Sequence, residues 1–132
     1  MNDLTQVSSI ESRIQTIRAV QVMIDADLAQ LYSVETKVLN QAVKRNITRF
    51  PQQFRFQLNP IEKNELVTNC DRFGNLKHST TLPYAFTEQG VAMLSAVLRS
   101  ETAVRTSIQI INAFVKMRQF LAHNADIFKR LD

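Results

Sequence analysis

Apolar side chains alternate with other residues in two short stretches of the chain. In residues 20–24 the sequence VQVMI places a branched apolar residue at every second position. Residues 54–58, FRFQL, place Phe, Phe and Leu in the same way, with Arg55 and Gln57 between them. Alternation with a period of two is typical of a strand that lays one face on a core. We therefore predict two short strands.

Between these strands, the apolar spacing changes to that of two short helices with a tight connection. Asp25 has the character of a cap for the first helix, which should end near Ser33. The second helix should run from about residue 35 or 36 to Asn46. Ala29 is small where the helices would cross, and Leu39 would anchor the second helix in the core. This arrangement predicts a helix-turn-helix, although Ser stands where Gly is favoured in the turn.

Capping signals mark two further helices. Asn59 is followed by proline and then by Glu62 at capping-box spacing, which predicts a helix start at this point. Thr87 should cap a helix that ends near Ser100. Gly90 lies inside that helix, where it indicates close packing.

Residues 102–122 have the most regular helical pattern in the chain, with two apolar stripes. The first stripe consists of Val104, Ile108, Ile111 and Val115, and the second of Ile110, Phe114, Met117 and Leu121. In one interpretation, both stripes pack within the same molecule. In the other, one stripe packs on the core and the other on a second copy in a homodimer, as in many dimeric DNA-binding proteins. The pattern leaves both open.

These elements predict one α+β domain over residues 1–132: mostly helical, with a helix-turn-helix, a small β-sheet or wing, and a long C-terminal helix. Two glycines and three prolines leave no flexible linker. Cys70 cannot form an intrachain disulfide because it is the only cysteine, and with two distant histidines it makes no metal motif. Nothing orients Cys70 and His78 as nucleophile and base. We expect no enzymatic activity, catalytic residue, metal or cofactor.

The N-terminal sequence lacks the basic start and apolar stretch of a signal peptide. No apolar run approaches the roughly 20 residues of a membrane-spanning helix. We therefore expect a soluble cytoplasmic protein with no membrane partner. The last helical pattern continues into the final residues, and the sequence leaves open whether a C-terminal effector or oligomerisation part follows it.

Charge is uneven along the chain. The chain has 16 Lys and Arg against 12 Asp and Glu, a net charge of +4. Residues 35–56 sum to +4 and residues 89–132 to +3, whereas residues 1–34 and 57–88 sum to −2 and −1. The first basic segment begins with the second helix of the pair. With Leu39 at the centre of the buried face, polar and cationic residues occupy the outward arc and the first turn: Thr36, Lys37, Asn40, Gln41, Lys44, Arg45 and Thr48. Amide side chains can pair with adenine, and Arg or Lys with guanine or phosphate, so this face predicts DNA binding.

A second cationic cluster surrounds a Gly-Asn pair in residues 72–78, RFGNLKH. We predict a turn between two strands here, with Arg72, Lys77 and His78 around it. As a wing, it would place Arg72 and Lys77 against backbone phosphates. A solvated hairpin tip is the alternative.

Two longer motifs carry a family resemblance: VMIDADLAQLYSVETKVLNQAVKRNITRFPQQFRFQL and, after it, LPYAFTEQGVAMLSAVL. They resemble the KilA-N superfamily, in particular the N-terminal domain of phage antirepressor-like proteins that is named for a phage open reading frame and is related to Bro-N. The resemblance covers about residues 14–121. It implies an α+β DNA-binding domain of phage, prophage or bacterial proteins, associated with the nucleoid. Family members usually have Gly at the position of Ser33.

We therefore expect sequence-specific binding of double-stranded DNA through the second helix, in transcriptional regulation or phage antirepression. Expected partners are DNA, a second copy through the 102–122 helix, and a regulatory protein. The alternative is a protein–protein interaction or oligomerisation module of a phage-derived regulator that makes no direct DNA contact.

Overall fold

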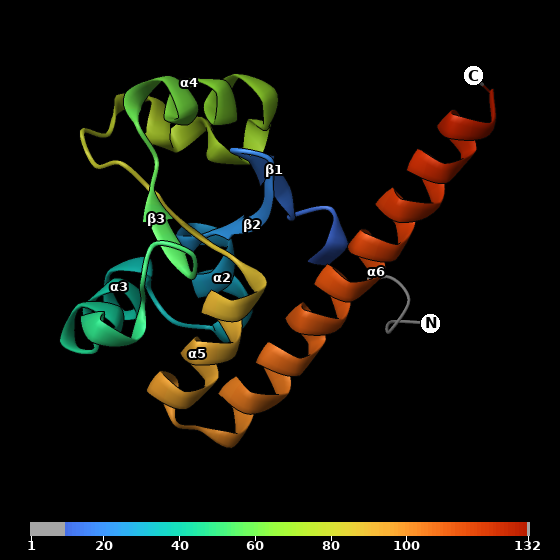
Figure 1. Cartoon of the computed structure of the whole chain (residues 1–132). Helices are drawn as coiled ribbons and strands as arrows, with labels where there is room; N and C mark the ends of the chain where they lie inside the picture. The colour runs from blue at the N-terminus through green and yellow to red at the C-terminus, as the bar shows by residue number, and fades with distance from the viewer. Residues whose placement is uncertain (1–9, 132) are drawn as a thin grey trace.

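The computed structural model describes the backbone of residues 10–131 and the side chains of residues 10–125. The fold is α+β, as predicted, with a small antiparallel sheet and a long C-terminal helix (Figure 1). The elements in chain order are β1 (Gln15–Ile17), β2 (Val20–Ile24), α2 (Asp25–Tyr32), α3 (Thr36–Arg45), η1 (Ile47–Arg49), β3 (Arg55–Gln57), α4 (Pro60–Asn69), η2 (Asp71–His78), β4 (Tyr84–Phe86), α5 (Glu88–Leu98) and α6 (Glu101–Leu131). Both predicted strands and all the predicted helices are present.

The sheet has the strand order β1-β2-β4-β3, and every neighbouring pair is antiparallel. Met23 pairs with Phe86 at its centre, and both side chains enter the larger apolar cluster. Val22 and Ile24 point to a second cluster on the other face, beneath α4 and η2. All three residues at the end of β2 are fully buried, because helices cover both faces of the sheet.

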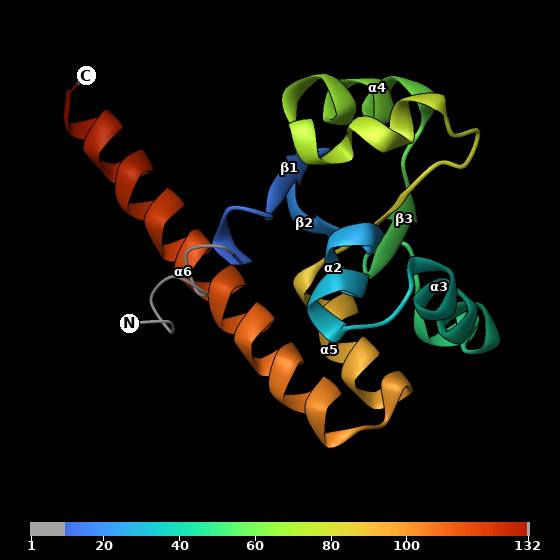
Figure 2. The same cartoon turned by 180° about the vertical axis from the view of Figure 1, so that it is seen from behind.

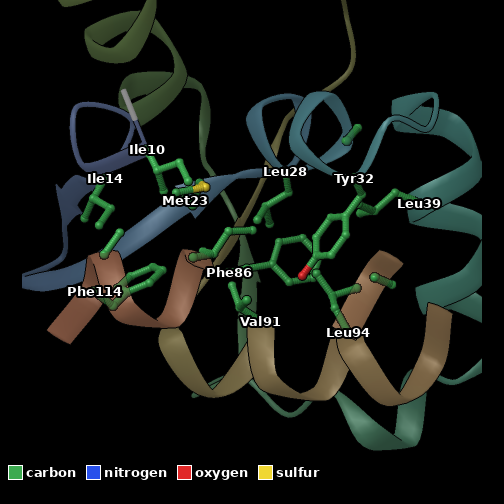
Figure 3. Packing of buried hydrophobic residues seen from close by; sticks show 14 of the residues in the cluster. Ile10, Ile14, Met23, Leu28, Tyr32, Leu39, Phe86, Val91, Leu94 and Phe114 are labelled. Carbon is green, nitrogen blue, oxygen red and sulfur yellow. The ribbon is translucent and has the colours of Figure 1, made fainter. Parts of the chain in front are cut away.

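The larger cluster joins the sheet to α2, α3, α5 and α6. Figure 3 shows Phe86 near its centre, among Leu28, Val91 and Leu94. The Tyr32 hydroxyl lies 2.6 Å from Ser107 Oγ, so that two buried polar groups satisfy each other. Burial raises the pKa of Tyr32 to about 12.

The last helix, α6, continues well past the predicted end at residue 122. Ile110 and Phe114 of its second apolar stripe are buried in the larger cluster. Val104 and Ile108 of the first stripe are 45% and 54% exposed. The C-terminal half of α6 stands away from the rest of the molecule, on the side opposite α3 (Figures 1 and 2).

The predicted wing is wrong. Residues 71–78 form the 3-10 helix η2 instead of a hairpin. The physical reason lies in Phe73 and Leu76, which share one face of a helix with three residues per turn. Phe73 is buried in the second cluster, and Leu76 packs against that cluster. Burial of these side chains outweighs the turn preference of the Gly-Asn pair.

The hairpin of the fold joins β1 to β2, through Arg18 and Ala19, which have φ angles of 56° and 62°. Such a turn normally has Gly or Asn at these two positions, so Arg18 and Ala19 do not indicate a hairpin in the sequence. Arg18 donates two hydrogen bonds to Glu62, at 2.8 and 2.9 Å, and lies 4.3 Å from the Phe56 ring centroid. Contacts of Arg18 with α4 and β3 thus hold the hairpin.

Two of the predicted caps are confirmed. Asn59 and Glu62 form the capping box of α4, and Thr87 Oγ1 accepts the N–H of Gly90 at 3.3 Å. The predicted cap at Asp25 is wrong by one position: Ile24 is the N-cap residue of α2, and Asp25 is the first helical residue. The shift arises because β2 runs directly into the helix and the Asp25 carboxylate finds other partners, described below.

Candidate nucleic-acid interface

A tight turn joins α2 to α3. Ser33 ends α2 in the left-handed conformation, with φ 60° and ψ 41°. The N–H of Val34 donates to the Ala29 carbonyl at 2.9 Å, which satisfies a free carbonyl at the helix end. Ala29 is 2% exposed, as expected for a small residue where helices approach. Ser33 therefore adopts the conformation that glycine favours, at a steric cost.

The outer surface of α3 and η1 is polar and cationic. Leu39 and Val43 are fully buried on the inner side of α3. The exposed residues of this surface, which we call the α3 face, are Lys37, Val38, Gln41, Lys44, Arg45, Ile47, Thr48 and Arg49. Among the residues that the structure describes, Lys37, Lys44 and Arg45 form no ion pair. Their charges are thus available to an anionic partner.

Asn40 does not point outward, and its predicted placement on the outward arc is wrong. It is half-buried, and its Nδ2 donates to Asp25 Oδ2 at 2.9 Å. The prediction placed the centre of the buried side at Leu39, whereas Leu39 and Val43 together define it and Asn40 lies beside them. Thr36 is likewise half-buried. Whether Asn40 contacts DNA remains a prediction.

The Asp25 carboxylate connects three elements. Besides the Asn40 amide of α3, it accepts the N–H of Ala26 in α2 at 2.8 Å and the N–H of Tyr84 in β4 at 3.3 Å. Asp25 is 5% exposed. Burial raises its pKa above the ordinary value, although these hydrogen bonds and the charge of Arg55 oppose the shift.

Arg55 joins the cationic surface, although sequence reasoning did not select it. Its guanidinium carbon lies 3.9 Å from the centroid of the Tyr84 ring. The two side chains line a hollow of about 390 Å³, shared with Lys37, Gln41 and Lys44. The signal that could have found Arg55 is its position in the basic segment 35–56. The strand pattern assigned it only to the polar side of β3.

The two cations of the predicted wing are separated. Arg72 donates from Nη2 to Asp27 Oδ2 at 3.1 Å and lines a cleft of about 770 Å³ that also includes Lys37 and Asn40. It therefore flanks the N-terminal half of α3. Lys77 lies in another hollow, beside α4. The structure thus brings Arg72, but not Lys77, near the α3 face.

Among residues 10–125, whose side chains the structure describes, no group of three or more His, Cys, Asp and Glu has an arrangement that could hold a metal ion. None of the helices described in residues 10–131 is both long enough and apolar enough to span a membrane.

Comparison with known families gives one match. Residues 12–97, well over half of the chain, match the ORF6N domain, which is found in phage-type regulatory proteins. The match includes α2, α3 and the sheet and ends before α6. It confirms the predicted resemblance at the level of this domain, whereas the relation to KilA-N and Bro-N remains a prediction. No curated protein and no solved structure matches the chain.

Proposed function

Because the chain belongs to the ORF6N domain family, we propose that this phage-associated regulatory domain binds double-stranded DNA in a sequence-specific manner. The α2–α3 pair acts as a helix-turn-helix, with α3 in the major groove. The observation that carries the proposal is the α3 face, whose Lys37, Lys44 and Arg45 are exposed and form no ion pair within the described residues. Cations arranged along one helix face supply the electrostatic part of duplex binding.

The residues of the surface divide into two roles. Gln41 lies at the middle of the exposed arc and, with Arg45, contacts base edges. Phosphates are contacted by Lys37, Lys44 and Thr48, with Arg55 and Arg72 at the flanks. Asn40 mainly positions α3, because its amide nitrogen already donates to Asp25.

A second candidate function has its own observation. Val104 and Ile108 of the first α6 stripe are about half exposed, whereas Ile111 of the same stripe packs against the larger cluster. We propose that Val104 and Ile108 pack against a second copy of the chain, which would place two α3 helices on one duplex. In this account the protein is a cytoplasmic, nucleoid-associated regulator of transcription or an antirepressor.

Selection from a pool of random duplexes tests the DNA proposal, alongside a measurement of the mass in solution. We expect enrichment of one sequence, with two-fold symmetry if the protein is a dimer. Recovery of unenriched DNA would contradict sequence-specific binding. A monomer mass on an enriched site that lacks symmetry would contradict only the dimer.

A further inference from the structure

Two residues of the α3 face are apolar, β-branched and about half exposed: Val38 in α3, at 47%, and Ile47 in η1, at 49%. Of the two, Val38 is the one within the helix that is proposed to enter the groove. Valine is a poorer helix former than Ala, Lys, Arg or Gln, so an exposed valine does not favour the helix. Leu39 and Val43 anchor α3 in the core, which leaves Val38 without a packing role in the described structure. The fold therefore offers no reason for valine at this position.

The position of Val38 is central to the proposed interface. Gln41 and Arg45 follow it at intervals of three and seven residues, so the three side chains share one side of α3. Asn40 is the other residue in this part of the helix whose amide could pair with a base, but its Nδ2 donates to Asp25. In the first two turns of α3, Val38 and Gln41 are therefore the residues that would lie against the base edges.

The surrounding charges select the partner. An apolar protein surface laid over Val38 would also cover Lys37 and Arg45, which form no ion pair in the described part of the chain, and burial of unpaired charge is costly. A DNA major groove avoids that cost, because phosphates pair with the cations. The same groove exposes one apolar group, the C5-methyl of thymine.

We infer that Val38 is a specificity-determining residue that packs on the methyl group of a thymine in the bound site. The inference rests on the proposed DNA binding and goes further, because it names a base and the atom that is recognised. It also separates the tasks on α3: hydrogen bonding by Gln41 and Arg45, apolar contact by Val38.

The test uses the selected duplex with each thymine replaced in turn by deoxyuridine, which lacks only the methyl group. For each α3 helix on the duplex, we expect one thymine at which the replacement weakens binding of the unmodified protein. The affinity should fall about fourfold there, which is the effect of losing the burial of one methyl group. Val38→Ala should bind the thymine and uracil duplexes equally. Val20→Ala is the matched control, because Val20 is 42% exposed in β2 and belongs neither to the α3 face nor to the proposed dimer surface; it should keep the full discrimination.

The results that would contradict the inference fall into two groups. If no uracil replacement changes affinity, or if Val38→Ala keeps the fourfold ratio, the inference is overturned while DNA binding stands. If the unmodified chain binds no duplex at low salt, the proposed function itself fails, and the inference with it. Thermal unfolding of Val38→Ala should match that of the unmodified chain, since an exposed side chain is removed.

Discussion

The side chain of Asn40 in α3 donates a hydrogen bond of 2.9 Å to the buried carboxylate of Asp25 in α2. Because Asp25 also accepts the N–H of Tyr84 at 3.3 Å, the same carboxylate connects both helices to β4. The orientation of α3 relative to the sheet is thus fixed by polar contacts as well as by Leu39 and Val43. A helix that presents side chains to a duplex needs such a rigid support.

Substitution of Asn40 separates this structural role from the roles of the exposed face. Asn40→Ala removes a donor from a buried carboxylate and should lower the free energy of unfolding by about 1–3 kcal/mol. Gln41→Ala, at an exposed position, should change it by less than about 0.5 kcal/mol. Urea denaturation measures both. Equal, small effects would contradict the role assigned to Asn40.

The raised pKa of Asp25 predicts a pH dependence of stability. The folded state binds the Asp25 proton more tightly than the unfolded state does. The contribution of Asp25 to the free energy of unfolding is therefore fully present below its ordinary pKa. It is lost as pH rises through the raised pKa. Asp25→Asn cannot ionise, so the stability of this variant relative to the unmodified chain should increase over that range. Urea midpoints from acid to neutral pH give the comparison, and a difference independent of pH would refute the prediction.

Ser33 predicts a stabilising substitution. Its φ of 60° places a Cβ in the left-handed region, which costs roughly 1–2 kcal/mol. Ser33→Gly should therefore raise the free energy of unfolding, by about 0.5–1 kcal/mol after the greater freedom of glycine in the unfolded chain is counted. Ser33→Ala keeps the Cβ, so this control variant should show no such increase in the free energy of unfolding. A gain for alanine equal to that for glycine would show that strain at this turn is not the cause.

Gly90 and Gly74 form a matched pair. A Cβ on Gly90 would lie 2.1 Å from the carbonyl oxygen of Phe54, whereas one on Gly74 would meet nothing within 4 Å. Gly90→Ala should destabilise the protein by about 3 kcal/mol or more, since backbone would have to move. Gly74→Ala should be close to neutral. Thermal unfolding of the two variants tests this, and similar melting temperatures would be the contrary result.

Local signals predicted much of this fold. The capping box at Asn59 and the Thr87 cap involve atoms only a few residues apart, so sequence spacing determined them. The two strands and the α2–α3 pair followed from apolar periodicity in the same way. For the α3 face, periodicity was sufficient to place Lys37, Gln41, Lys44 and Arg45 outside.

Features that depend on distant contacts were missed. Asn40 turns inward because Asp25, fifteen positions earlier, offers it a buried partner. Arg55 reaches the α3 face because Tyr84 supports its guanidinium across the sheet. The 72–78 segment is helical because Phe73 packs into a cluster built by other elements. None of these relationships leaves a periodic pattern in the sequence.

The salt dependence of duplex binding tests the central claim most directly. If the α3 face neutralises several phosphates, the logarithm of the affinity should fall linearly with the logarithm of salt concentration, and Lys44→Ala should reduce the slope by about one unit. Lys116→Ala removes the same charge from an exposed position on α6 and should leave the slope unchanged. The absence of duplex affinity at low salt, or equal slopes for Lys44→Ala and the unmodified protein, would contradict DNA binding through this face.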